Sequence, residues 1–468
     1  MTRECDVAVI GAGAAGVAAS VVAARSGCRV SLLDTGARPG GQYYRGADLS
    51  ALPASGLSYA ALAGDLNRLI AGGVVDYRPR TTAYALERAS DRLVVRTRGD
   101  DRHRGDVGIV TAGTVILATG AFDRPLPFPG WTLPGVMTGG GAQSLVKGQG
   151  VLPGRRVVVA GTGPFLLAVA ATLLEHGADV AAVVEANDPV GASLRQARGL
   201  AAGIGKSGDL TRFVTALTRH RVPYLRRHRI VEAIGDGRVT GVRIARVDAD
   251  WHPIAGTERV IECDAVSVGF GFVAQLDLAA QVGARVVPGA DGGLAVHVDD
   301  DQVTSAPGLL AAGETTGIGG VDAARVEGLV AGATAAARSG RTSALSVTAV
   351  DGARRDVARW RRFAAALHAT FPVRSGWVDS VREDTLVCRC EEVPVARVRE
   401  AVELGARDAR TVKLLSRAGM GWCQGRMCAA AVDGLCGFED VASLQGASYR
   451  PVAVPVPLGA LAAEAVEG

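Results

Sequence analysis

The chain has 468 residues, more than one hydrophobic core usually serves, so two or three domains are expected. Its composition of 48% hydrophobic and 21% charged residues, with 62 glycines, is typical of a folded globular protein and argues against disorder. The 51 basic and 47 acidic residues give a net charge of +4, which is too balanced to indicate a nucleic-acid partner.

Two long apolar runs, residues 7–24 and 157–174, have the hydropathy of membrane segments. Each contains a glycine cluster where a valine-rich run changes to an alanine- and leucine-rich run, as a buried strand turning into a buried helix does. We therefore predict neither a signal peptide nor an integral membrane segment, and a cytoplasmic protein. In that reducing compartment, the eight cysteines point to metal or redox roles rather than to a disulfide framework.

The first strand–helix–strand unit carries the pattern of a dinucleotide site. Residues 6–10 are predicted to form a strand that leads into three glycines at the start of a helix. Gly11 permits a tight turn, Gly13 lets the backbone approach a pyrophosphate, and Gly16 lets the helix pack closely on the strand. Asp34 ends the next strand, where a carboxylate can accept both ribose hydroxyls. The alternative is a glycine-rich structural turn.

Two distant segments favour FAD over NAD at this site. Residues 114–120 and 308–314 each have the pattern of a strand that ends in a glycine turn, and such strand ends return the chain to the same crevice. A helix predicted over residues 321–337 would turn its N-terminal amides towards a reduced flavin ring. Glu314 is a candidate to bind a ribityl hydroxyl. Gly40, Gly41 and Gln42 are candidates to line the pyrophosphate or the flavin, with a plain loop as the alternative.

In this order, the three segments resemble the two-dinucleotide-binding-domain flavoproteins. The resemblance implies an α/β fold with two nested Rossmann-like domains. It also implies FAD contacts at Gly11, Gly13, Gly16, Asp34, Gly120, Gly313 and Glu314. Members of that family commonly have Asp at the position of Glu314, so the exact contact of this longer side chain is left open.

A second unit, which begins at residue 156, repeats the plan with one change. Gly161 and Gly163 are in place, but Leu166 stands where a third glycine or alanine is usual, which pushes the helix away from the strand or demands local repacking. Glu185 ends the following strand, where an acid suits an unphosphorylated ribose and disfavours NADP. Three interpretations stay open: NADH turnover, an adenine nucleotide held without redox chemistry, and an empty site.

Four of the eight cysteines cluster near the C-terminal end of the sequence, namely Cys388, Cys390, Cys423 and Cys428. Helical patterning between the two pairs would bring them together. Four thiolates suit either tetrahedral zinc or a 2Fe-2S cluster, but the Cys-x-Cys spacing is unusual for zinc. Neighbouring glycines, together with Arg389 and Arg426, suit the sulfurs and the negative charge of a cluster. A 2Fe-2S cluster is therefore favoured over zinc and over unligated thiols.

The segment from residue 387 to residue 432 resembles the bacterioferritin-associated-ferredoxin-like domain, a small helical 2Fe-2S module. With a two-domain FAD protein in front of it, the whole chain is similar to one narrower family. That family comprises the A or alpha subunits of opine oxidases, of D-hydroxyproline dehydrogenases and of dye-linked proline dehydrogenases, and the B subunit of hydrogen cyanide synthase. The resemblance implies FAD and a 2Fe-2S cluster, and it leaves open a second nucleotide (NAD or ATP) or an FMN at a subunit interface.

The same resemblance implies a second flavoprotein (beta) subunit, with a small third subunit left open, and a small amino acid or imino acid substrate. The favoured function is an electron-transfer subunit of a complex that oxidises the substrate's C–N bond and passes electrons to an acceptor, with the substrate site in the partner. One alternative is a self-contained NADH-dependent reductase of an external acceptor. A third is a non-enzymatic scaffold or redox sensor.

We expect a discontinuous FAD-binding domain over residues 1–115 and 265–340, with a second dinucleotide-binding-like domain over 116–264. A helical linker (341–384), the 2Fe-2S domain (385–436) and a tail (437–468) follow. The linker carries an apolar stripe at helical spacing, which packs either onto its own chain or onto a partner: Ala353, Val357, Trp360, Ala364, Leu367 and Phe371. The tail, rich in proline and valine, is expected to be extended, either around a neighbour or frayed.

Overall fold

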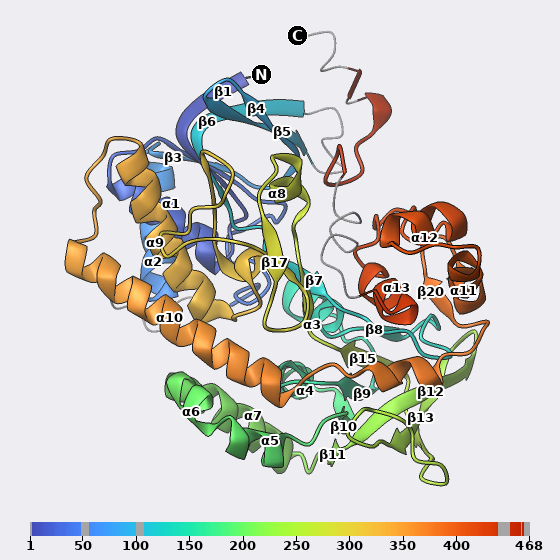
Figure 1. The fold of residues 1–468 in the computed structure, drawn as a ribbon. Helices are drawn as coiled ribbons and strands as arrows, with labels where there is room; N and C mark the ends of the chain where they lie inside the picture. The colour runs from blue at the N-terminus through green and yellow to red at the C-terminus, as the bar shows by residue number, and fades with distance from the viewer. Residues whose placement is uncertain (1, 48–55, 100–106, 439–449, 460, 463–468) are drawn as a thin grey trace.

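The computed structural model describes residues 2–47, 56–99, 107–438, 450–459 and 461–462. Figure 1 shows two sheet-based lobes, a long helix that runs along both, and a small group of helices beside them. The predicted fold class, an α/β chain with two nested Rossmann-like domains and a small helical domain, is confirmed. In the part of the chain that the structure describes, no helix has the length and apolarity needed to cross a bilayer.

The first sheet has seven strands in the order β3-β2-β1-β6-β5-β4, with β19 beside β6. The strands are β1 (Thr2–Ile10), β2 (Val30–Leu33), β3 (Val75–Arg78), β4 (Thr81–Ala89), β5 (Arg92–Gly99), β6 (Val107–Leu117) and β19 (Leu309–Ala311). Strands β2, β1, β6 and β19 run parallel, and the register aligns Ile10 with Leu33 and Leu117, and Leu117 with Ala311. The carboxyl ends of these strands therefore meet at one edge, where ligands of open α/β sheets bind.

Four helices cover this lobe: α1 (Ala14–Arg25), α2 (Tyr59–Ala71), α9 (Val321–Arg338) and α10 (Val347–Thr370). Helices α1 and α9 approach closely because Gly328 and Gly332 lack side chains: a Cβ there would lie 2.2 Å from the Ala15 oxygen and 2.6 Å from the Ala19 oxygen. In α10 the apolar stripe is buried at its N-terminal half and joins the core of α1 and α9 through Ala353, Val357 and Trp360. The stripe thus packs onto its own chain.

The second sheet has the order β11-β10-β9-β15-β8. Its strands are β8 (Val136–Thr138), β9 (Arg156–Gly161), β10 (Asp179–Glu185), β11 (Tyr224–Arg226) and β15 (Ala265–Gly269). The helical elements of this lobe are α3 (Gly139–Gln149), α4 (Phe165–Glu175), α5 (Pro189–Arg195), α6 (Ala197–Leu200), η2 (Ala201–Lys206) and α7 (Ser207–Arg219). Because β15 pairs with β9 and β8, the second domain continues beyond residue 264, where we expected it to end.

Further, smaller sheets accompany the two main sheets. They are β12 (His228–Asp236), β13 (Arg238–Arg246) and β14 (Arg259–Glu262); β7 (Ala121–Asp123) with β16 (Phe272–Ala274); and β17 (Val286–Pro288) with β18 (Leu294–Val296). The short helix α8 (Asp277–Gln281) follows β16, and η3 (Gly313–Thr316) follows β19.

The small helical domain contains η4 (Ser375–Ser380), β20 (Leu386–Cys388), β21 (Val393–Pro394), α11 (Val395–Glu403), α12 (Ala409–Ser416) and α13 (Ala429–Cys436). Buried hydrogen bonds connect this domain to the second lobe. Trp131 donates from Nε1 to the Leu386 oxygen at 2.6 Å, and the buried Arg229 guanidinium donates to the carbonyl oxygens of Trp251, Gly376 and Trp377. Because such groups are costly to leave unpaired, these contacts hold the domain in a defined place.

Candidate functional site

The first glycine loop is built from close backbone contacts. A Cβ on Gly11 would lie 2.2 Å from the Ala118 oxygen, and one on Gly16 would lie 1.8 Å from the Gly11 oxygen. Gly11 also has a φ of +104°, which other residues rarely adopt. The loop can therefore turn tightly above β6 and let α1 approach β1, as a pyrophosphate-binding loop requires.

A second segment completes this loop. Gly41 has a φ of +58°, and a Cβ there would lie 2.9 Å from the Gly13 Cα. Asp34 is half-buried at the end of β2, and its carboxylate accepts hydrogen bonds from the backbone N–H groups of Ala12 and Gly36. The acid thus fixes the loop while it also lines the neighbouring cavity.

That cavity is large, with a volume of about 2820 Å³. Nine of the ten residues predicted to bind FAD or line its site line the cavity, and Gly16 lies behind the loop: Gly11, Gly13, Asp34, Gly40, Gly41, Gln42, Gly120, Gly313 and Glu314. Single-ligand sites typically occupy roughly 300–1,000 Å³. The cavity therefore has room for a dinucleotide and for further groups, and its glycine cradle fits FAD.

The turn before α9 is held by two acids. Glu314 accepts a hydrogen bond from the Gly320 backbone N–H at 2.7 Å, and the buried Glu327 accepts one from the Gly313 N–H at 2.8 Å. Gly320 has a φ of +85°, so the chain turns there to present the N-terminus of α9 beside the cavity. The positive end of the helix dipole then faces the place where a flavin ring would carry negative charge.

Two cavity residues escaped the sequence analysis. Asp123 ends β7, and burial raises its pKa although hydrogen bonds from Thr138 and from the start of α3 oppose the shift. Lys147 lies across the cavity on α3, where burial lowers its pKa. Asp123 follows the predicted Gly120 turn by three residues, which was the available signal; nothing near Lys147 in the sequence marked it.

The second glycine loop resolves the question raised by Leu166. Gly161 lies against β15, where a Cβ would be 1.8 Å from the Gly269 oxygen. Leu166 is fully buried, and a Cβ on Gly269 would lie 3.4 Å from its Cδ2. The large side chain is thus accommodated by local repacking, because the strand opposite it carries glycine. Gly163 lines the cavity, whereas Gly161 does not.

Glu185 lies inside the protein and is not part of the cavity wall. Its side chain is fully buried and accepts hydrogen bonds from the Thr162 hydroxyl and from the backbone N–H groups of Gly163 and Asn187. Asn187 in turn contacts the Pro372 carbonyl oxygen and accepts from the Trp251 ring N–H. Burial raises the pKa of Glu185 to about 7. The structure does not bring this acid to a position where it meets a ribose.

The structure brings the four predicted cysteines together. Cys428 is hydrogen-bonded to both Cys388 and Cys423, and Cys423 is hydrogen-bonded to Cys390. Hydrogen bonds from Cys428 and from the backbone N–H groups around the loop lower the pKa of Cys388 to about 6 and that of Cys423 to about 5. The same contacts raise the pKa of Cys428, whose single S–H proton is shared between the two neighbouring sulfurs. The thiolate, the form that binds iron, is therefore favoured at Cys388 and Cys423, whereas burial and the contact with Cys423 raise the pKa of Cys390.

Within the described ranges, no three Cys, His, Asp or Glu side chains meet as the ligands of a single metal ion do. The four thiols form a continuous chain of contacts from Cys388 through Cys428 and Cys423 to Cys390, a set that can ligate the two irons of a cluster. The two arginines predicted to offset the cluster charge are engaged elsewhere. Arg389 stacks over Trp131 at 5.1 Å, and Arg426 pairs with Asp277 at 3.1 Å.

Comparisons with known proteins agree with this arrangement. Residues 5–340 match a family model described as pyridine nucleotide-disulphide oxidoreductase, and residues 386–436 match the BFD-like 2Fe-2S binding domain. Among curated proteins, the chain is similar to the HcnB subunit of hydrogen cyanide synthase from Pseudomonas aeruginosa, at 33% identity over 90% of each chain. It is also similar to the A subunit of opine oxidase from Agrobacterium tumefaciens, at 33% identity over 98% of this chain and 91% of that protein.

Among solved structures, L-proline dehydrogenase from P. horikoshii has a similar fold, with a TM-score of 0.67 and 19% sequence identity. The similarity covers 98% of this chain and 80% of that chain.

Proposed function

Because the chain belongs to the pyridine nucleotide-disulphide oxidoreductase family and to the group that contains the A subunits of opine oxidases, we propose that it is the electron-transfer subunit of a heteromeric amino acid or imino acid dehydrogenase or oxidase. It is a flavin-dependent oxidoreductase whose two matched domains imply FAD and a 2Fe-2S cluster. In the proposal, a partner flavoprotein holds the substrate, an amino acid, imino acid or opine, and oxidises its C–N bond.

The observation that carries the proposal is the extent of the cavity. It runs from the first glycine loop to Arg426 and Met427, which stand between the cluster ligands Cys423 and Cys428. A flavin in the cavity and a cluster on this loop would therefore be neighbours. The relatives at 31–34% identity are themselves named as subunits of opine oxidase, hydrogen cyanide synthase and sarcosine oxidase, which supports a partner chain.

Each group of residues has a defined task in this proposal. The glycine loop, Asp34 and Gly41 hold the dinucleotide, and the N-terminus of α9 faces the flavin. The four cysteines Cys388, Cys390, Cys423 and Cys428 hold the cluster. FAD takes up two electrons at once, whereas the cluster carries one at a time. Asp123 lines the cavity, and because burial raises its pKa it would hold a proton more readily than an exposed carboxyl.

The proposal is tested by expressing the chain together with a candidate partner flavoprotein. We expect the two chains to purify as one complex that reduces a dye when an amino acid, imino acid or opine is added, and each chain alone to fail. The Cys428→Ser variant should keep FAD but lose the iron, the sulfide and the dye reduction. A chain that purifies alone and reduces dye with substrate would contradict the proposed division of labour.

A second candidate function is favoured by the other end of the cavity. It reaches Gly163 in the second glycine loop, so a further nucleotide, NAD or ATP, has room there, as has an FMN at a subunit boundary. If NADH binds there productively, the chain is a self-contained reductase of an external acceptor. Rapid bleaching of the flavin by NADH alone is the signature of that function.

A further inference from the structure

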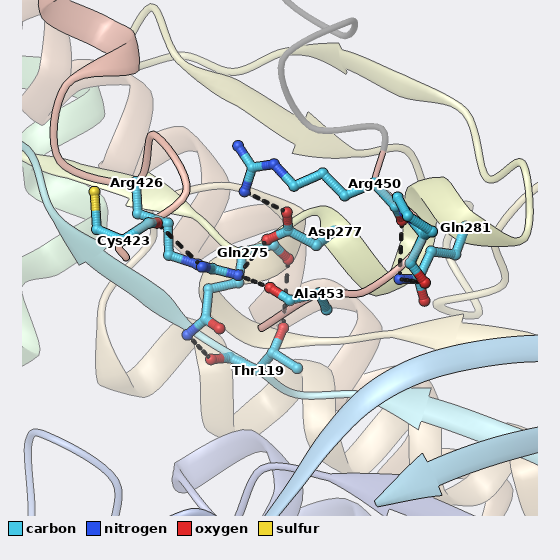
Figure 2. A network of polar contacts seen from close by, with 9 residues as sticks. Thr119, Gln275, Asp277, Gln281, Cys423, Arg426, Arg450 and Ala453 are labelled. Atoms are coloured by element: carbon cyan, nitrogen blue, oxygen red, sulfur yellow. Dashed lines mark hydrogen bonds and ion pairs between the residues drawn. The ribbon is translucent and has the colours of Figure 1, made fainter. Parts of the chain in front are cut away.

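A buried carboxylate lies between the cluster loop and the flavin cavity. Asp277, at the start of α8, binds Arg426 through Oδ2 and Arg450 through Oδ1, each at 3.1 Å (Figure 2). All three side chains are only 11–13% exposed. Ion pairs of this kind are weak at a surface but strongly destabilising to break when buried, because the remaining charge is left without a partner.

On one side, Asp277 is fixed to the predicted flavin site. Gln275, two residues before it, donates from its backbone N–H to the Gly120 oxygen at 3.0 Å and from its side chain to the Thr119 oxygen at 2.6 Å (Figure 2). Thr119 also shares a hydrogen bond with Thr315, which lies beside Glu314. The carboxylate is therefore tied to two of the turns that meet at the cavity.

On the other side, Arg426 is part of the cluster loop. It lies between the ligands Cys423 and Cys428, and its guanidinium also donates to the Cys423 carbonyl oxygen at 3.2 Å. The same guanidinium lies over the Phe122 ring at 5.5 Å from its centroid, and both residues line the cavity. One side chain thus contacts the cluster loop, the acid and the cavity wall.

The C-terminal segment, residues 450–453, contacts both Arg426 and the first lobe. Ala453 accepts a hydrogen bond from Arg426 and donates to the Tyr84 oxygen of β4 at 2.6 Å. The Arg450 oxygen accepts from the Gln281 side chain at 3.1 Å, and Ala453 is buried. We expected the tail either to surround a neighbour or to fray; in the described residues 450–453 it lies instead along the first lobe of its own chain.

We propose that Asp277 and Arg426 are positioning residues that hold the cluster loop in a fixed place relative to the flavin cavity. Arg450 and Ala453 support this pair through their own contacts with Asp277 and Arg426. The inference rests on the proposed cofactors but not on the substrate or the partner. The Asp277–Arg426 salt bridge then determines where the cluster lies relative to the flavin. No local sequence motif determines that placement. Removing Arg426 releases the loop from Asp277, and removing Asp277 also leaves both buried arginines without this carboxylate.

The test uses the whole chain, loaded with both cofactors and kept anaerobic, in the variants Arg426→Gln, Asp277→Asn and the double variant. The matched control is Arg397→Gln, which removes an arginine paired with Glu400 on the exposed face of α11 in the same domain. Three quantities are measured: backbone hydrogen exchange at residues 423–428, the reduction potential of the cluster, and the rate at which electrons redistribute between flavin and cluster after a pulse of reductant.

In both single variants we expect the backbone amides of residues 423–428 to exchange about tenfold faster and the electrons to redistribute about tenfold more slowly. An effect of this size corresponds to the interaction energy that contacting residues usually show. The double variant should lose no more than the worse single variant. Arg426→Gln should also lower the cluster potential, because it removes a positive charge from the loop and leaves the charge of Asp277 matched by Arg450 alone. The control should match the wild type. If Arg426→Gln folds poorly, Arg426→Lys is measured in its place, and because it keeps the charge it should retain the potential of the cluster.

The inference would be overturned if both single variants showed amide exchange and electron redistribution at wild-type rates. It would also be overturned if the effects of the two substitutions were simply additive in the double variant. A wild-type chain that lacks FAD or iron would instead contradict the proposed function. Because the readouts need neither substrate nor partner, the two failures are distinguishable.

Discussion

The two glycine loops of this chain follow the same plan, but the acids that end their second strands lie in different surroundings. Asp34 is half-buried at the cavity edge, whereas Glu185 is fully buried beneath Asn187 and does not line the cavity. The first loop also requires glycine at its third position, and the second accommodates Leu166. The same fold thus provides one open dinucleotide site and one whose acid serves the structure.

The largest effect should come from the third glycine of the first loop. Gly16→Ala places a Cβ 1.8 Å from the Gly11 oxygen, so we expect a loss of bound FAD and a destabilisation of more than about 3 kcal/mol. Flavin content and urea unfolding measure both. Gly64→Ala is the control, since that helical glycine has open space around its Cβ. FAD retained at wild-type content in Gly16→Ala would show that the loop is less closely packed than described.

Glu185, the buried acid of the second loop, should make the free energy of unfolding depend on pH. Burial raises the pKa of Glu185 from 4.5 to about 7, so its contribution to stability is complete below pH 4.5 and is lost as the pH rises through 7. The loss amounts to about 3 kcal/mol. Glu185→Gln cannot ionise, so its free energy of unfolding should fall less between pH 5 and pH 8 than that of the wild type.

Burial also raises the pKa of Asp433 to about 7, but that group is present in both proteins and cancels from the difference. Equal slopes for the two proteins would mean that Glu185 stays accessible to water, and the contrast between the two acids would fail.

Asp34 should act on the binding of the ligand. Asp34→Asn weakens the hydrogen bonds from Ala12 and Gly36 and removes the charge that we propose to meet the ribose, so we expect FAD to bind about tenfold less tightly. Flavin fluorescence during dialysis measures the affinity. Asp76→Asn, on the neighbouring strand β3 and half-exposed, should bind FAD as the wild type does.

The smallest effect belongs to the second loop. Gly163 has no atom within 4 Å of its would-be Cβ but has a φ of +98°, so Gly163→Ala should cost about 1 kcal/mol of backbone strain. FAD content should not change. A loss comparable with that of Gly16→Ala would mean that the two loops are equally constrained.

The part of this site that the sequence predicted is the part decided by local geometry. Gly11, Gly16 and Gly41 are glycines because backbone atoms leave no room for a Cβ, and the cysteine spacing fixes which thiols can meet. The burial of Glu185 could not be predicted, because its neighbour Asn187 is held by Trp251 and Pro372, which are distant in sequence. The pairing of Asp277 with Arg426, 149 residues apart, has no sequence signal either.

The most direct test of the account is anaerobic stopped-flow mixing of the loaded chain with NADH, followed by the flavin absorbance. We predict that the flavin stays oxidised on the timescale of turnover, and that it bleaches when the partner flavoprotein and its substrate are supplied instead. Rapid bleaching by NADH alone would show that the second loop is a working nicotinamide site, and would contradict both the comparison of the two loops and the role of the chain within a larger complex.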